Sequence, residues 1–327
     1  IAVANCASCH GVHNILPSSD PASFTHADNL AATCGKCHVG AGSRFTIAPV
    51  HTLADDTPNV VAHWIRLIYI PLIWVTVIGM LLHNLLDMVK KTRTYSMWRR
   101  RAPEHSVIKE RMARPFRLAH ALAALSFFVL VYTGFALKYP ESWWAELLQF
   151  GDNEFRGQAH RIAAVGLMGA CLFHFGHLAI SARARGQMAA FLPRIADFKE
   201  FSHRLAYNLG RRADPPAPVR VGYVEKVEYW AALWGTFVTA ITGLVLWFEN
   251  FTLTWLPGWV PEAATVLHFL EAILATLAIL IWHFYSVMLD PAVYPMDMTW
   301  LTGKPPFSRA EERGEVIDED DAEQENA

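Results

Sequence analysis

Five long apolar stretches limit most strongly what this chain can fold into. A helix needs about 20 consecutive apolar residues to cross the hydrocarbon core of a bilayer, and each stretch reaches that length. Hydrophobic residues make up 53% of the chain, and its mean hydropathy is positive. The sequence therefore predicts an all-α membrane protein with five transmembrane helices. We expect these helices at residues 65–88, 117–138, 160–181, 229–249 and 263–288.

The other segments divide the chain into four parts. Residues 1–64 are polar, and we expect a loop-rich domain held together by cofactors, because so short a segment can hardly form an apolar core. Residues 65–116 contain the first helix and a basic loop, and residues 117–306 contain a four-helix domain. Residues 307–327 are dominated by Glu and Asp, a composition typical of a disordered tail.

Lys and Arg are distributed unequally among the connecting segments. The 89–117 loop carries ten of them against two acids, and the 182–228 loop carries nine against five. The 139–159 loop has one, and the 250–262 loop has none. Cytoplasmic loops of membrane proteins collect Lys and Arg, so both basic loops are predicted to be cytoplasmic. Five spans then place the N-terminus in the periplasm and the C-terminus in the cytoplasm, in a bacterial inner membrane.

Two CxxCH motifs lie in the N-terminal segment. The two thiols of such a motif can form thioethers to a haem, and the adjoining His can bind its iron. We therefore expect at least two covalent c haems and a location outside the cytoplasm, where c-type haem is attached. A zinc site is the alternative, although zinc sites rarely place a His directly after both Cys pairs. The motif residues are Cys6, Cys9 and His10, and Cys34, Cys37 and His38.

Each c haem would take its second axial ligand from elsewhere in the chain. The candidate distal ligands are His13, His26, His51 and His63. Two haems need only two such ligands. The other two histidines either have no ligand role or bind further haems that are attached to upstream sequence or to a partner chain. His63 begins the first predicted helix, so a haem bound there would lie at the membrane surface. The chain begins with Ile rather than Met, so we expect a signal peptide to have preceded it.

Histidines also recur in the apolar helices, where ionisable side chains are costly and by default functional. His268 and His283 lie on the last predicted helix, about 22 Å apart along its axis. They differ by about 60° around that axis, close to one face. One helix thus offers a ligand near each side of the membrane, which suits two haems.

Helix direction selects the partners of these two histidines. His120 lies at the start of a helix that begins in the cytoplasm, and His160 at the start of one that begins in the periplasm. The consistent pairs are His160 with His268 on the periplasmic side and His120 with His283 on the cytoplasmic side. Two b haems with two His ligands each keep no open iron site, so they suit electron transfer.

Several motifs in residues 114–305 resemble a known family. The chain resembles the b-type cytochrome (gamma) subunits of respiratory formate dehydrogenases and nickel-iron hydrogenases, in the bacterial cytochrome b561 superfamily. The resemblance implies two b haems held at His120, His160, His268 and His283. The N-terminal head is similar to periplasmic multihaem cytochrome c modules. The motifs are Arg114-Pro-Phe-Arg-Leu-Ala-His120, Val131-Tyr-Thr-Gly-Phe-Ala136, Gly157-Gln-Ala-His160-Arg161, Ile281-Trp-His283-Phe-Tyr285 and Tyr294-Pro-Met-Asp-Met-Thr-Trp-Leu-Thr-Gly-Lys304.

The same resemblance implies a quinone site near the cytoplasmic-side haem. His83 and Asn84, near the cytoplasmic end of the first helix, are candidates to line it. His174, in the cytoplasmic half of the third helix, is another, because a His can exchange a proton with a quinone oxygen. Alternatively, His83 and His174 hold a third b haem, or they make only hydrogen bonds between helices.

Together these features predict an electron-transfer subunit of a quinone-linked oxidoreductase complex. Electrons would pass between quinone or menaquinone and a periplasmic partner, either oxidoreductase subunits or multihaem cytochromes. No catalytic residue is assigned. The alternative is a haem-wire anchor of a periplasmic oxidoreductase, with the quinone chemistry elsewhere. A net charge of −2 gives no general affinity for nucleic acid, and the helices lack the inverted repeats of a transporter.

Overall fold

A computed structural model divides the chain into two compact units. Unit 1 comprises Ile1–Leu72 and Phe237–Ala272, and unit 2 comprises Ile73–Thr236 and Ile273–Ala327. The structure describes residues 5–38, 41–42, 59–94, 106–108, 110–147, 153–217, 219–312 and 316–318.

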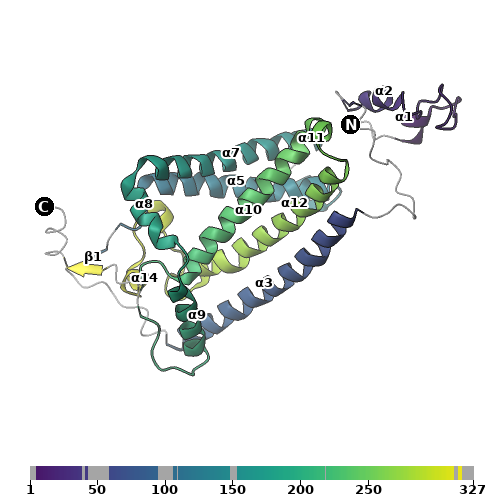
Figure 1. Ribbon diagram of the computed structural model, residues 1–327. Helices are drawn as coiled ribbons and strands as arrows, with labels where there is room; N and C mark the ends of the chain where they lie inside the picture. The colour runs from purple at the N-terminus through teal and green to yellow at the C-terminus, as the bar shows by residue number, and fades with distance from the viewer. Residues whose placement is uncertain are drawn as a thin grey trace. The chain divides into compact units, whose positions relative to one another are not determined.

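Five helices of the described residues are long and apolar enough to cross a membrane, which confirms the predicted all-α membrane fold. Large side chains such as Trp74, Leu125 and Leu172 remain exposed on them. This exposure suits lipid surroundings, because lipid tails are as apolar as Leu. The helices (Figure 1) are α3 (Val60–Arg93), α5 (Arg114–Lys138), α7 (Asn153–Ile180), α10 (Tyr223–Trp247) and α12 (Trp259–Ala278), continued by the π-helical η3 (Ile279–His283) and η4 (Tyr285–Leu289).

In unit 2, α5 and α7 lie side by side (Figure 1). A Cβ added at Gly166 of α7 would lie only 2.6 Å from Ser126 Oγ of α5. Small residues at helix contacts in membranes allow such close approach of two backbones. The short helix α6 (Trp143–Leu147) follows α5, and the Tyr132 hydroxyl donates a hydrogen bond to the Trp144 carbonyl at 3.2 Å.

The basic loop between α7 and α10 contains regular structure. It forms α8 (Ala182–Met188), the 3₁₀ turn η2 (Ala189–Phe191) and α9 (Ile195–Asn208). Asp197 bonds to Lys226 Nζ at 2.5 Å, which ties α9 to the start of α10. Burial raises the pKa of Asp197, but the hydrogen bonds and charges of Lys226 and Arg194 together lower it more, so the pKa lies below its usual value. This ion pair therefore favours the ionised carboxylate.

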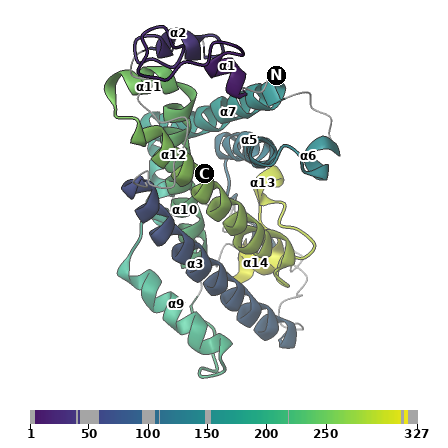
Figure 2. The ribbon, with the colours of Figure 1, turned by 90° about the vertical axis from the view of Figure 1, so that its right-hand side faces the viewer.

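The C-terminal segment packs back on unit 2 before it reaches the tail. The short helix α13 (Thr299–Thr302) packs on α5 (Figure 2). Gly303 follows with φ of +86°, a left-handed conformation that glycine adopts at little cost. Its carbonyl accepts hydrogen bonds from the backbone N–H groups of Arg111 and Met112, at 2.9 and 3.1 Å. The residues after η4 are therefore anchored to the start of α5.

The predicted disordered tail differs from the structure at its first residues. Phe307–Glu312 form α14, where Ala310 is fully buried and Arg309 lies 3.3 Å from Asp290. The ion pair of Arg309 with the buried Asp290 thus stabilises a helix in a segment whose acidic composition predicts disorder. The strand β2 (Val316–Asp318) then pairs antiparallel with β1 (Ser106–Ile108).

In unit 1, the N-terminal segment is held mainly by hydrogen bonds between side chains and backbone. It contains only two short helices, α1 (Cys6–His10) and α2 (Leu30–Gly35), among its described residues. The Thr33 hydroxyl donates to the Phe24 carbonyl at 2.8 Å, and Asn29 Nδ2 donates to the Ser23 carbonyl at 2.9 Å. These loops therefore keep their conformation with few buried apolar side chains.

The transmembrane part of unit 1 begins with a tie between two helix starts. Asn59, just before α3, donates from Nδ2 to the Trp259 carbonyl at 2.9 Å and to Glu262 Oε2 at 3.0 Å. The helix α11 (Glu249–Trp255) lies between α10 and α12 in the chain. The start of α3 is thus held against the start of α12.

Candidate functional site

His120 of α5 and His283 of η3 lie together in unit 2. Their ring centroids are 6.3 Å apart, and the ring planes meet at 47°. A bond from a metal to an imidazole nitrogen is about 2.1 Å long, so two imidazoles on opposite sides of one metal ion have centroids about 6 Å apart. The separation of these two rings therefore fits a shared metal ion.

The ring nitrogens of this pair have different surroundings. His120 Nδ1 is buried and has no hydrogen-bond partner among the described residues. His283 Nδ1 lies 3.4 Å from Glu228 Oε2, and Glu228 Oε1 accepts a hydrogen bond from Ser286 Oγ at 3.0 Å. A metal-bound His usually donates its other ring N–H to a carboxylate or a carbonyl. Glu228 is therefore placed to orient His283 as a ligand, a role that the sequence did not reveal.

His283 belongs to a π-helical stretch, although the sequence predicted a continuous α-helix. The α-helical register of 100° per residue holds only as far as Ala278. Asn84 Nδ2 donates to the Ile281 carbonyl within this stretch at 2.7 Å. Single π-helical turns inside α-helices often occur at functional sites. No residue pattern around Ile279–His283 signals the change of register.

His160 of α7 is held by α5 within unit 2. Its Nδ1 atom lies 2.9 Å from Thr133 Oγ1. A Cβ added at Gly134 would lie 3.2 Å from His160 Cε1. The ring thus rests against a backbone position that has no side chain.

His268 of α12 is held in the same way within unit 1. Its Nδ1 atom lies 2.9 Å from Thr242 Oγ1 of α10. A Cβ added at Gly243 would lie 3.3 Å from His268 Cε1. A Thr-Gly dipeptide therefore holds each of these two predicted ligands inside its own unit.

The two CxxCH motifs differ in local structure. Cys6, Cys9 and His10 all lie in α1, whereas Cys34 lies in α2, which ends at Gly35, and Cys37 and His38 follow that helix. The five cysteines form no disulfide with one another, and Cys6 and Cys37 are exposed. The described residues bring together no group of three or more His, Cys, Asp and Glu side chains that could hold a metal ion.

The predicted distal ligands have different local surroundings. His13 is exposed, and His26 is half-buried beside Asp28, whose backbone N–H donates to His26 Nδ1 at 3.3 Å. His63 is exposed in the first turn of α3, with its ring edge-on to Trp64. His51 lies outside the described residues.

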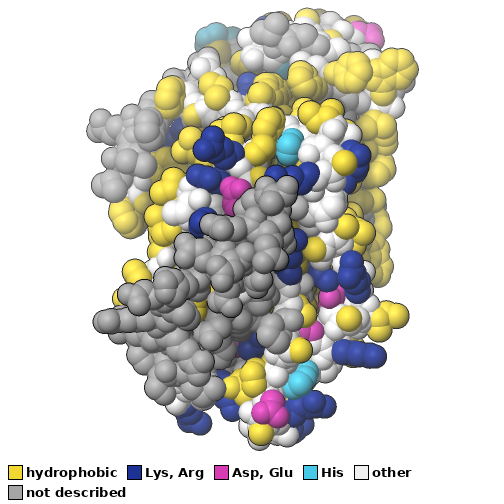
Figure 3. Space-filling model, turned by 90° about the vertical axis from the view of Figure 1, so that its left-hand side faces the viewer, with side chains coloured by type: hydrophobic (Ala, Val, Ile, Leu, Met, Phe, Trp, Pro, Cys, Tyr) yellow, Lys and Arg dark blue, Asp and Glu magenta, His cyan; other side chains and the backbone are white. Residues whose placement is uncertain are grey.

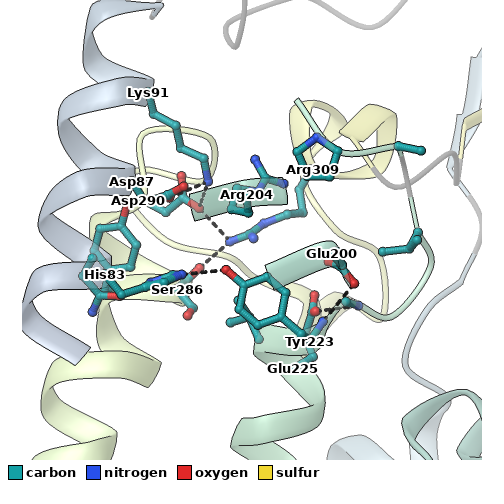
Figure 4. Close-up of a pocket in the computed structure, with 17 residues that line it drawn as sticks. His83, Asp87, Lys91, Glu200, Arg204, Tyr223, Glu225, Ser286, Asp290 and Arg309 are labelled. Atoms are coloured by element: carbon teal, nitrogen blue, oxygen red, sulfur yellow. Dashed lines mark hydrogen bonds and ion pairs between the residues drawn. The ribbon is translucent and has the colours of Figure 1, made fainter. Parts of the chain in front are cut away.

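A pocket of about 80 Å³ lies beside His83 in unit 2 (Figure 4). His83 Nε2 is 2.6 Å from the Tyr223 hydroxyl, and its Nδ1 is 3.3 Å from Asn84 Oδ1. The His83 ring stacks on Trp282, with centroids 4.7 Å apart. His83, Asn84 and Tyr223 all line this pocket.

His174, the third predicted quinone-site residue, does not line this pocket. Its Nε2 atom lies 3.1 Å from the Tyr229 hydroxyl, and its ring contacts Phe116. His83 and His174 therefore bond to two different tyrosines.

The pocket ends at a buried ion cluster formed by Asp87, Lys91, Asp290 and Arg309 (Figure 4). Lys91 Nζ lies 2.7 Å from Asp290 and 3.0 Å from Asp87. Burial raises the pKa of Asp290, but Lys91 and Arg309 lower it more, so Asp290 is held ionised. The i, i+4 spacing of Asp87 and Lys91 was the available sequence signal for half of this cluster.

Replacing Lys91 by methionine is expected to destabilise unit 2 strongly. The change leaves Asp87 and Asp290 buried without their shared cation, and removing one partner of a buried ion pair typically costs about 3–5 kcal/mol. Thermal loss of helical circular dichroism in detergent measures the effect. Lys90→Met is the matched control, because among the described residues the Lys90 ammonium makes a cation–π contact with Tyr207 and no ion pair. Equal melting temperatures for the two variants would contradict the prediction.

A family comparison covers the part of the chain that holds the membrane histidines. Residues 111–295, more than half of the chain, match the family described as prokaryotic cytochrome b561. The match includes α5, α7, α10 and α12, with His120, His160, His268 and His283. No curated protein matches the chain. The family binds b-type haem, and the ring separation of His120 and His283 fits that group. The chain therefore belongs to the prokaryotic cytochrome b561 family, as a multi-pass membrane cytochrome b that transfers electrons.

Proposed function

We propose that this cytochrome passes electrons between the quinone pool and a periplasmic redox partner. It would act as the b-type subunit of a quinone-linked complex such as a formate dehydrogenase or a nickel-iron hydrogenase. The observation that carries the proposal is the continuity between the pocket and a histidine pair. His83 stacks on Trp282, and Trp282 directly precedes His283. A residue of the pocket thus stacks on the side chain that directly precedes a haem-ligand candidate in the chain.

His120 with His283 and His160 with His268 would each hold one b haem. When bound, these haems supply one-electron carriers. The 6.3 Å separation of the two rings supports the first pair. Glu228 orients His283 from the side of Nδ1.

The pocket beside His83 is the proposed quinone site. His83 and Asn84 would contact the quinone ring oxygens, and the Tyr223 hydroxyl keeps the His83 ring in place. His83 can hold the proton that a quinone oxygen gains on reduction or loses on oxidation. Glu200 of α9 also lines the pocket, and burial raises its pKa, so it is a second group able to carry a proton there.

The charge distribution supports a cytoplasmic location of this pocket. Lys and Arg side chains recur on the face of unit 2 that carries α8, α9 and α14 (Figure 3). Since cytoplasmic segments are enriched in Lys and Arg, we place that face in the cytoplasm and the CxxCH segment in the periplasm. Quinone chemistry on one side and partner contact on the other would move charge across the membrane.

The CxxCH segment would carry at least two c haems toward the partner. Their proximal ligands would be His10 and His38, and His63 would place a haem ligand at the start of α3. His13, His26 and His51 are the other distal candidates.

Cysteine variants test the c haems. Replacing both cysteines of either motif by alanine is expected to remove one covalent haem, because the thioethers of that motif can no longer form. Haem staining after denaturing electrophoresis and pyridine haemochrome spectra measure the loss. Cys171→Ala is the control, since this thiol lies in α7 outside both motifs. Absence of covalent haem from the unaltered protein, with bound zinc instead, would overturn this part of the proposal.

Quinol-driven reduction tests the function as a whole. The purified protein is mixed with a short-chain menaquinol, and the absorption of the b haems is followed. We expect their reduction without any other subunit. If dithionite reduces the haems but menaquinol does not, the chain serves as a haem-wire anchor with quinone chemistry elsewhere.

A further inference from the structure

The same contact occurs at two unrelated points of the chain. Thr133-Gly134 of α5 holds His160, and Thr242-Gly243 of α10 holds His268. Both Thr–His distances are 2.9 Å, and the two Gly–His approaches are 3.2 and 3.3 Å. The first set lies wholly in unit 2 and the second wholly in unit 1. Each of the two Thr-Gly contacts with a histidine is therefore formed within a single unit.

The threonine hydroxyls decide which ring nitrogen carries the proton. Thr133 Oγ1 donates to the Val129 carbonyl at 2.6 Å, and Thr242 Oγ1 donates to the Val238 carbonyl at 2.7 Å. A hydroxyl has a single proton. Each threonine donates its hydroxyl proton to a backbone carbonyl one turn earlier in its own helix. The hydroxyl oxygen can therefore only accept a hydrogen bond from the His ring, which requires a proton on Nδ1.

The Nδ1–H tautomer leaves the other ring nitrogen available to a metal. A neutral imidazole with its proton on Nδ1 keeps its lone pair on Nε2, and that lone pair is what binds a metal. Both histidines are thus held in a tautomer that suits a haem ligand.

The glycines place the rings. An added Cβ would lie only 3.2–3.3 Å from Cε1 of each imidazole, closer than an ordinary contact, and 3.6–3.7 Å from Nδ1. A methyl group at either position would push the ring away from its threonine by a few tenths of an ångström. Both threonines are buried, so water is not available to replace the lost bond.

We propose that Thr133 and Thr242 are positioning residues that hold His160 and His268 as Nδ1–H tautomers for haem ligation, and that Gly134 and Gly243 seat the rings. The proposal rests on the assignment of both histidines as ligands of the periplasmic-side haem. A metal-bound His becomes more basic when its other ring N–H, the one that does not bind the metal, donates to a hydrogen-bond acceptor. The two threonines therefore favour oxidised iron at that haem.

The test is a redox titration of Thr133→Val and Thr242→Val. Valine keeps the shape but removes the acceptor, so we expect the haem to remain bound and its reduced-to-oxidised ratio to rise up to tenfold at a given potential. For a one-electron couple, tenfold is about 59 mV. Thr133→Ser and Thr242→Ser restore the hydroxyl and should restore the potential. The haem at His120 and His283 is the internal control, and its potential should not move.

Two outcomes separate this proposal from the function on which it rests. If the valine variants bind both b haems with unchanged potentials and unchanged electron paramagnetic resonance, the threonines are only packing residues and the proposal is overturned. If His160→Ala and His268→Ala keep every b haem, the ligand assignment itself fails. Loss of haem from the alanine variants, with a shifted potential in the valine variants, supports both.

Discussion

Replacing His283 by alanine is expected to remove one of the two proposed b haems and leave the other. The variant takes away one of the two nitrogens that would hold the cytoplasmic-side haem. His120 would then be its only proposed ligand, since Glu228 lies on the Nδ1 side of His283. Pyridine haemochrome spectra of the purified protein, with the haem b content set against protein, measure the loss.

His177→Ala is the control for this loss. His177 also lies in a membrane helix, but its described ring contact is with Phe116 and no haem pair includes it. We expect this variant to keep both b haems. Glu228→Gln should retain the haem with about 10- to 100-fold weaker binding, as for other partners of metal-bound histidines. Full haem content in His283→Ala would show that the pair is structural.

Replacing His83 by leucine is expected to slow quinol-driven haem reduction by about 100-fold, the low end of what a positioned acid–base group contributes. The leucine keeps bulk against Trp282 but cannot exchange a proton with the quinone. Stopped-flow absorption after mixing with menaquinol gives the rate. Reduction by dithionite should be unchanged, because it does not require the pocket.

Two tyrosine variants show whether the slower haem reduction arises at the pocket beside His83 or at His174. Tyr223→Phe removes the hydroxyl that bonds His83 and should slow the reaction less than His83→Leu. Tyr229→Phe removes the hydroxyl that bonds His174, outside the pocket, and should leave the rate unchanged. If haem reduction is slow in Tyr229→Phe and has the normal rate in Tyr223→Phe, the quinone site lies at His174 instead. Loss of a b haem from His83→Leu would instead identify His83 as a ligand of a third haem.

The sequence predicted the helices better than the contacts between them. Each membrane helix is a local object, and a run of apolar residues long enough for the bilayer defines it. All five predicted spans are therefore found, within a few residues of their bounds. The α-helices within the 182–228 loop and the helix α14 were not predicted, because they depend on distant partners such as Lys226 for Asp197 and Asp290 for Arg309.

The candidate site shows the same division. The types and positions of the histidines were readable, and His120 with His283 was paired from topology alone. Glu228, Tyr223 and the two Thr-Gly dipeptides were not found, because a Glu, a Tyr or a Thr-Gly in an apolar helix carries no signal of the His it faces. The π-helical register at His283 also went unseen, since hydrogen bonds from i to i+5 leave no mark in residue type.

By itself the sequence determined a five-helix membrane protein with two CxxCH motifs and histidines at membrane depth. These features follow from chain-local chemistry: hydropathy, motif spacing and the charge of loops. Only the tertiary structure decided which side chains hold each histidine and where a pocket opens beside His83. Those contacts join residues far apart in the chain, such as Thr133 with His160 and His83 with Tyr223. Their geometry depends on helix packing, which no single segment specifies.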